Sequence, residues 1–286
     1  MAATSPTTVR QVPTTVIDPA DLFLEPYRVP ADFDNIKVLI HHPDPTPLPP
    51  ASPYDIDSLR AATLTNTPTS TNLGDMLSII IGGPVLDKLR PIVPIYGRSH
   101  TWKPLEPTAP QTRPHMTIGL RRTASCENLT EALNEMGRAA LPTIPMSDFV
   151  FPFASFEAVV SLRVARRANV HSGAHMILAL RNLHVRACGE VSARQSFDDT
   201  TQAMTVSFTA DVVEIMVHWT TRSPEGRLWF HATVAESWST ANRDAWFQAS
   251  QAMRNIIAWQ RAIRDVRANL AILQLAIMDG LATTVV

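Results

Sequence analysis

The sequence is poor in cysteine and in long apolar runs. Cys126 and Cys188 are the only cysteines among 286 residues, too few for a disulfide framework or for a zinc site built on cysteines. The most apolar segment, residues 76–86, is broken by Gly82-Gly83-Pro84 and is shorter than the roughly 20 residues that a membrane span needs. The first 17 residues do not resemble a secretory signal. We therefore expect an intracellular protein, cytoplasmic or nuclear, that is not secreted and has no membrane partner.

An excess of charge of either sign is also absent. The chain carries 25 basic and 26 acidic side chains, so its overall charge gives no argument for nucleic acid or an anionic membrane as partner. Only three of the basic residues are lysines, and arginine is the better bidentate ligand for phosphate. A GC-rich coding bias would give the same composition. With 45% hydrophobic residues the chain can bury a full-sized core, which excludes a mostly disordered protein.

Basic residues gather locally between residues 161 and 194. This stretch contains six arginines and one acidic residue, Glu190. Such an excess is explained either by a solvated helix face or by a surface that contacts phosphates. If it contacts phosphates, the residues that we expect to bind nucleic acid are Arg163, Arg166, Arg167 and Arg181.

Proline content divides the chain into three zones. Residues 1–54 include a proline-dense run at 43–53, which indicates an extended arm or linker that could contact a protein partner. Residues 55–112 are predicted to wrap around the folded core with little regular structure. Residues 113–286 hold the clearest periodicity and are expected to form the folded core.

Within that core the pattern predicts strands and helices, with three consecutive strands before a terminal helix, and hence an α/β layer fold. The turn Ser223-Pro224-Glu225-Gly226 predicts a hairpin between the last two strands. A long closing helix is expected to begin at Thr240 as N-cap. The predicted strands are 115–120, the middle of 149–164, 203–209, 212–219 and 228–234, and the predicted helices are 127–139, 165–185 and 240–270.

Two histidine pairs are candidates for chemistry. His171 and His175 stand four residues apart on a predicted helix, as two metal ligands would, but no third ligand is evident and a structural role is favoured. His218 and His231 lie on the two strands of the predicted hairpin, within reach of each other, either as a packed hydrogen-bonded pair or as an acid and base. No nucleophile elbow and no glycine-rich phosphate loop are present.

Four blocks of sequence resemble a known family. They are Arg113–Leu120, Phe151–Val159, Val217-His218-Trp219 together with Trp229-Phe230-His231, and Asn255–Trp259. In order and spacing they are similar to the PD-(D/E)XK nuclease-like proteins of fungi, over roughly residues 110–272. The resemblance implies a restriction-endonuclease-like fold: a mixed central sheet flanked by helices, here with a long C-terminal helix. In that family an Asp and a Glu hold Mg²⁺ and a Lys assists the attacking water.

This sequence departs from the family's motif at two of three positions. His115 stands at the position of the metal-binding Asp and Val159 at that of the Lys, so that only Glu157 remains. One carboxylate beside an imidazole is a poor Mg²⁺ site, although it could take a softer ion such as Mn²⁺ or Zn²⁺. We predict that the nuclease chemistry is lost, with no confident catalytic residue, no resident metal and no cofactor; Mg²⁺ or Mn²⁺ enters only if activity is retained.

Three functions follow as hypotheses. The first is a catalytically degenerate nuclease-like module that binds DNA or RNA through the arginine-rich helix. The second is a structural or protein-interaction protein, accessory or coat-like, that uses residues 1–54 as its contact segment. The third is a residual metal-dependent nuclease with a relocated ligand, for instance Asp198 or Asp199.

Overall fold

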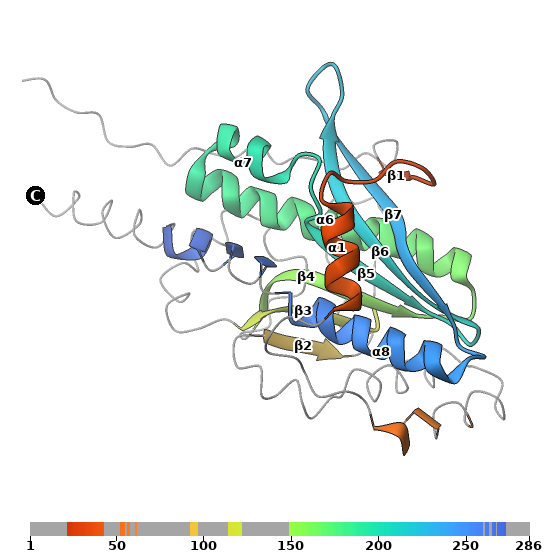
Figure 1. Ribbon diagram of the computed structural model, residues 1–286. Coiled ribbons are helices and arrows are strands. Elements are labelled where there is room, and N and C mark those ends of the chain that lie inside the picture. The colour runs from red at the N-terminus through yellow and green to blue at the C-terminus, as the bar shows by residue number, and fades with distance from the viewer. Residues whose placement is uncertain are drawn as a thin grey trace, which may run out of the picture.

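The computed structural model describes eleven regular elements (Figure 1). The residues described are 22–42, 52–54, 56–57, 61, 92–96, 114–121, 149–259, 261–262, 265–266 and 268–272, with the backbone alone at 92–96, 120–121 and 149–150. The predicted helix at 127–139 and most of the predicted wrapping segment at 55–112 lie outside these residues. The elements are β1 (Leu22–Leu24), α1 (Phe33–His41), β2 (Ile92–Tyr96), β3 (Met116–Arg121), β4 (Phe149–Ala158), α6 (Leu162–Cys188), α7 (Glu190–Phe197), β5 (Ala203–Phe208), β6 (Val212–Arg222), β7 (Leu228–Ser239) and α8 (Arg243–Ile257).

Seven strands form one mixed sheet in the order β1-β7-β6-β5-β4-β3-β2. Neighbouring strands are antiparallel except for β4–β5 and β1–β7, which are parallel. A parallel pair needs a crossover connection, and the long helix α6 lies in the one between β4 and β5. The predicted mixed sheet packed with helices is confirmed, and the five predicted strands correspond to β3–β7.

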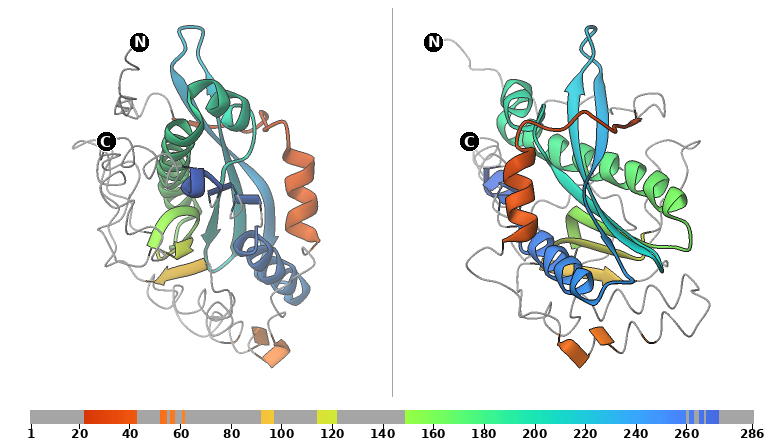
Figure 2. Two further views of the ribbon diagram at one scale, coloured as in Figure 1. Left: turned by 90° about the vertical axis from the view of Figure 1, so that its left-hand side faces the viewer. Right: turned by 45° about the vertical axis from the view of Figure 1, so that its right-hand side comes forward.

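Helices cover both faces of the sheet: α6 lies on one side and α1 and α8 lie on the other (Figure 2). Strand β5 is buried at every position, as expected for a strand enclosed between two helical layers. Phe208 of β5 meets Trp246 of α8 edge to face, whereas its neighbour Ser207 accepts a hydrogen bond from Asn169 of α6. The apolar core nevertheless reaches both helical layers, because α6 contributes Met176, Ile177 and Leu180 to it and α8 contributes Trp246, Met253 and Ile256. In the part of the chain that is described, no helix is both long and apolar enough to cross a membrane.

The predicted long closing helix is wrong. Helix α8 spans 15 residues and ends at Ile257, because Ala258 leaves helical geometry with φ −84° and ψ 10° before helical residues resume at Arg261. The break buries Trp259, which is 4% exposed. The N-cap is Asn242, whose side chain accepts from the Asp244 amide at 2.9 Å. Thr240 does not cap the helix because its hydroxyl donates to the Ala210 carbonyl.

The extended arm expected over residues 1–54 is wrong for residues 22–42. Strand β1 pairs with β7, and the Glu25 amide continues this pairing by donating to the Ala232 carbonyl at 2.8 Å. Helix α1 buries Ile36 and Ile40 and receives a hydrogen bond at the Ile40 carbonyl from Asn255 of α8. The proline-dense run begins only after α1 ends, so it does not oppose these elements. Residues 43–51 of this run lie outside the described residues, and a partner contact there stays a prediction.

The two hairpin histidines do not meet. His218 lies opposite Ala232, and His231 lies opposite Trp219, so the register places the two rings on opposite faces of the sheet. The His218 ring faces α6, and its Nε2 is 2.8 Å from the Thr205 hydroxyl. The His231 ring is stacked between Trp219 and Phe23 on the other face. The prediction of a histidine pair within reach is therefore wrong.

Helix α6 lies very close to the sheet at Gly173. A Cβ atom at this position would lie 2.1 Å from Nδ1 of His218, a distance that no real pair of atoms adopts. An alanine substitution in an ordinary helix gains about 1 kcal/mol over glycine. Here that gain is opposed by a clash with a ring that is 1% exposed and held by Thr205.

We therefore expect Gly173→Ala to lower the free energy of unfolding by about 1–3 kcal/mol. Urea unfolding of the two proteins measures the difference. In a double-mutant cycle, Gly173→Ala should lower the free energy of unfolding much less in a His218→Ala protein, which lacks the ring, than in the wild type. A stabilised Gly173→Ala protein would show that α6 does not approach the sheet at this residue.

Two buried histidines should make the fold sensitive to acid. Burial lowers the pKa of His218 to about 3. Burial also lowers the pKa of His175 to about 4, although the hydrogen bond that His175 donates to the His171 carbonyl opposes this shift. In the unfolded chain both groups bind a proton near pH 6.5, whereas the folded chain excludes it. Their contribution to stability is complete above pH 6.5 and is lost as the pH falls towards 4 and then 3.

We expect unfolding free energies, measured by urea at a series of pH values, to decline below pH 6.5 by up to about 1.4 kcal/mol per pH unit for each histidine. The variant His218→Gln keeps an amide that can bond Thr205 and does not titrate. The slope of its unfolding free energy against pH should be smaller than that of the parent protein by the contribution of one bound proton. An unchanged slope would contradict the assignment to His218.

Candidate functional site

The face of the sheet beneath α6 is lined by polar side chains. Thr117, Ser155 and Thr205 lie in register across β3, β4 and β5, and the Thr205 hydroxyl meets His218 of β6. The next row holds Glu157, Ser207 and Glu214, again in register on neighbouring strands. All of these side chains are buried. A buried polar layer needs partners, and α6 supplies Asn169 to Ser207 and Arg166 to Glu214.

His115 and Glu157, the two ends of the degenerate motif, lie side by side. The antiparallel register of β3 and β4 pairs Met116 with Phe156, which places His115 beside Glu157. His115 Nδ1 is 3.8 Å from Glu157 Oε1, and both residues are 9% exposed. The Ala158 amide donates to the same Nδ1 at 3.1 Å. In a neutral His115 ring the proton therefore lies on Nε2.

This geometry does not suit a metal ion. The ring nitrogen nearest to Glu157 already accepts a backbone hydrogen bond, so its lone pair is not free to coordinate. Val159 carries no polar group, and its amide extends the β4–β5 pairing by donating to the Phe208 carbonyl at 3.0 Å. Within the described ranges no group of three or more His, Cys, Asp and Glu side chains is placed to hold a metal. The site has one carboxylate and a hydrogen-bonded imidazole.

The four arginines predicted to bind nucleic acid do not share one surface. Arg163 and Arg167 are exposed on the first two turns of α6, and neither forms an ion pair or hydrogen bond with a described residue. Arg166 faces the sheet and binds Glu214 with Nε and Nη2, at 2.9 and 2.5 Å. Arg181 is 4% exposed and donates to Glu190 at 2.5 Å. The structure therefore offers two of the four to a ligand.

The spacing of residues along the sequence does not show that carboxylates bind Arg166 and Arg181. Glu214 lies 48 residues after Arg166 and reaches it only through the register of β5 and β6. A helical period does separate the two kinds of arginine: Arg166 shares its face with Asn169 and Gly173, three and seven residues on. Arg163 and Arg167 share another face at i and i+4. That distinction was available from the sequence.

The relocated acids, Asp198 and Asp199, lie at the wrong end of β5. Glu157 is beside Ser207, near the end of that strand, whereas the two aspartates precede its first residue. Asp198 accepts from Arg222 at 3.2 Å and from the Thr220 hydroxyl at 3.4 Å. Neither aspartate can complete a site at Glu157. The structure therefore does not bring either aspartate to Glu157 as a relocated ligand, and residual nuclease activity itself stays a prediction.

His171 and His175 are on one helix, as predicted, but they do not form a ligand pair. His175 Nδ1 is 2.7 Å from the His171 carbonyl oxygen, which fixes that nitrogen as a donor to the backbone. The His175 ring is buried, at 3% exposed. Burial and the nearby Arg167 lower the pKa of His171. The pair is part of the packing of α6.

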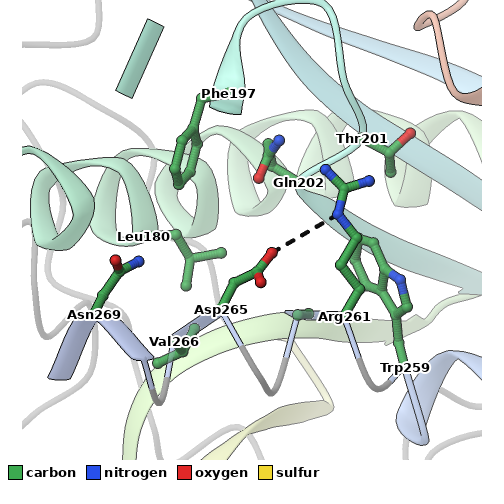
Figure 3. Close-up of a pocket in the computed structure, with 10 residues that line it drawn as sticks. Leu180, Phe197, Thr201, Gln202, Trp259, Arg261, Asp265, Val266 and Asn269 are labelled. Atoms are coloured by element: carbon green, nitrogen blue, oxygen red, sulfur yellow. Dashed lines mark ion pairs between the residues drawn. The ribbon is translucent and has the colours of Figure 1, made fainter. Parts of the chain in front are cut away.

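A small pocket lies between α6, the start of β5 and the chain after α8 (Figure 3). Its walls include Leu180, Phe197 and Trp259, and its polar side chains include Arg261 and Asp265, which lie 3.7 Å apart. In the close-up Asp265 points towards the Arg261 guanidinium rather than into an open space. Arg261 also pairs with Asp32 at 3.0 Å. The polar groups are engaged with one another, and the pocket is remote from the Glu157 end of β5.

Comparison with known proteins gives one family match. No curated protein matches the chain. Residues 83–268 match the model of a domain of unknown function, DUF7924. The match covers the strands β2–β7 and the helices α6–α8 described above, and more than half of the sequence. The chain belongs to the DUF7924 family.

Proposed function

We propose that this protein is a catalytically degenerate PD-(D/E)XK nuclease-like module, with a restriction-endonuclease-like arrangement of its sheet, that binds nucleic acid. The resemblance implies an Asp and a Glu that hold one Mg²⁺ ion, so the positions of these two residues should lie close together. The contact between His115 on β3 and Glu157 on β4 supports this expectation. The mixed sheet between helical layers is consistent with the same fold.

The observation that carries the binding proposal is the pair of exposed arginines at the start of α6. Arg163 and Arg167 are four residues apart on one face and have no acidic partner among the described residues. The first turn of α6 contains no acidic residue, so its amide groups and the helix dipole add positive potential. Helix α6 begins five residues after Glu157 in the chain. The basic face and the degenerate motif therefore lie at one end of the sheet.

Loss of two motif side chains explains why binding is proposed without cleavage. His115 is held by the Ala158 amide, and Val159 can neither donate to a phosphate nor orient a water molecule. Guanidinium groups bind phosphate oxygens through charge and hydrogen bonds, and this needs no metal ion. DNA and RNA share that backbone chemistry, and the binding test below includes both.

We expect Arg163→Glu and Arg167→Glu each to weaken binding of short DNA and RNA oligonucleotides. Each substitution should lower the magnitude of the slope of log K against log salt by about 1, the loss of one phosphate contact. Fluorescence anisotropy at four salt concentrations measures the slope. The matched control is Arg243→Glu, because Arg243 is also exposed but is paired with Asp57 at 2.7 Å. Equal effects of all three substitutions would contradict a specific role for the α6 face.

The same oligonucleotides should remain intact. We expect no cleavage when the protein is incubated with them in Mg²⁺ or Mn²⁺, because the site has a single carboxylate. Denaturing gels over several hours provide the measurement. Cleavage that EDTA stops and that Glu157→Ala removes would establish a residual nuclease and refute the proposed loss of catalysis.

A further inference from the structure

Three arginines converge on one carboxylate at the far end of α6. Glu190, the first residue of α7, accepts through Oε1 from Arg181 Nη2 at 2.5 Å and from Arg222 Nη2 at 2.6 Å. Arg194 Nε is 3.5 Å from the same oxygen. The three guanidinium groups come from α6, β6 and α7, so the tertiary fold rather than one helix brings them together. Figure 1 shows α7 next to the end of α6, on the side of the sheet where the turn of the β6–β7 hairpin lies.

The charges of this cluster do not balance. Arg222 Nε also donates to Asp198, at 3.2 Å, so the three arginines face two carboxylates. Since arginine is always protonated, the cluster keeps one positive charge in excess. Burial alone would raise the pKa of Glu190, but hydrogen bonds and charge from Arg181 and Arg222 hold it below the ordinary value. The cluster therefore strongly favours a negatively charged group at this position.

Glu190 satisfies the arginines incompletely. All three donors meet one of its oxygens, and the side chain is 42% exposed. The Arg181 side chain is 5% exposed, and its buried Nε has no hydrogen-bond partner among the described residues. A buried donor without a partner costs about 1–3 kcal/mol. An anion with more oxygens than a carboxylate could reach donors that Glu190 leaves unused.

A simple structural staple accounts for part of this arrangement. The ion pairs of Glu190 do connect α7 to α6 and β6. Two arginines, Arg181 and Arg222, are enough to make these two connections, so the third, Arg194, is not needed for a staple, and an ion pair as exposed as that of Arg194 adds little stability. A staple leaves the excess charge and the unpartnered Arg181 nitrogen unexplained. A site for a multiply charged anion explains both.

We propose that Arg181, Arg194 and Arg222 form a binding site for a phosphate dianion, which the Glu190 carboxylate occupies as an internal substitute. With Glu190 displaced, the three arginines and Asp198 carry two net positive charges, and a phosphate monoester near pH 7 carries close to two negative charges. A phosphodiester carries only one and matches less well. Three fixed guanidinium groups also provide the forked donors that phosphate oxygens accept.

This site is separate from the proposed nucleic-acid surface. Arg181 lies 14 residues beyond Arg167 on α6, which is about 21 Å along a helix. Binding at one site therefore does not require binding at the other. Free phosphate and the terminal phosphate of a nucleic acid share the chemistry that the cluster selects.

Isothermal titration calorimetry with inorganic phosphate at pH 7.5 and constant ionic strength tests the proposal. We expect saturable binding to the wild-type protein and at least tenfold tighter binding to Glu190→Gln, in which the competing carboxylate is gone. The matched control is Asp57→Asn, which removes a comparably exposed acid and frees the single arginine Arg243. If Glu190→Gln binds phosphate no more tightly than Asp57→Asn, the proposal is refuted.

A second variant keeps the test independent of how well Glu190→Gln folds. Arg194 is 58% exposed, so Arg194→Gln should fold normally and bind phosphate at least threefold more weakly than wild type. Dimethyl phosphate, a monoanion, should bind wild type at least tenfold more weakly than inorganic phosphate. Unchanged affinity in Arg194→Gln, or equal affinity for the two anions, would overturn the proposal.

Competition distinguishes the two sources of the phosphate group. A trinucleotide with a 5′-phosphate, added to Glu190→Gln that also carries Arg163→Glu and Arg167→Glu, should displace inorganic phosphate, and its 5′-hydroxyl counterpart should not. This result would support the site and identify a nucleic-acid end as a ligand. Displacement by both trinucleotides alike would refute selection for the dianion.

Discussion

The close packing of α6 on a polar face of the sheet is the constraint on which the other features depend. At Gly173 the helix backbone comes so near to β6 that the His218 ring occupies the space where a Cβ atom would be. No room remains there for bulky apolar side chains or a layer of solvent. Some polar groups under the helix bond to one another, as Asn169 does with Ser207 and His218 does with Thr205, whereas Ser155 Oγ has no hydrogen-bond partner among the described residues.

This packing also decides which side chains of α6 can meet a ligand. The face that contains Gly173 and Asn169 is fixed against the sheet, so Arg166 on the same face can only reach Glu214. Arg163 and Arg167 are turned to solvent by the same rotation of the helix. At the other end of α6, Arg181 lies at the contact with α7, where it donates a hydrogen bond to Glu190. A single helix orientation thus separates structural arginines from available ones.

The sequence predicts the sheet well because strands enclosed between helices are rich in β-branched and aromatic residues and are bounded by turns. The hairpin at Ser223–Gly226 was predictable for the same reason, and Gly226 adopts φ +85°. Contacts set by register were not predictable: the separation of His218 and His231 depends on an offset of one residue between β6 and β7. The break at Ala258 is accompanied by the burial of Trp259, a tertiary contact that helical periodicity in the sequence does not reveal.

The N-terminal elements bear on where this domain begins. Strand β1 supplies the edge partner of β7, and α1 lies against α8, yet both precede residue 83, where the family match starts. Asp32 reinforces the connection, because it accepts from the Thr201 amide at 2.9 Å and pairs with Arg261. The segment recognised by sequence likeness is thus smaller than the unit that packs together. A protein cut at the family boundary would expose a bare strand edge and the α1-facing side of α8, so the cooperative unit of this fold includes residues from Leu22 onward.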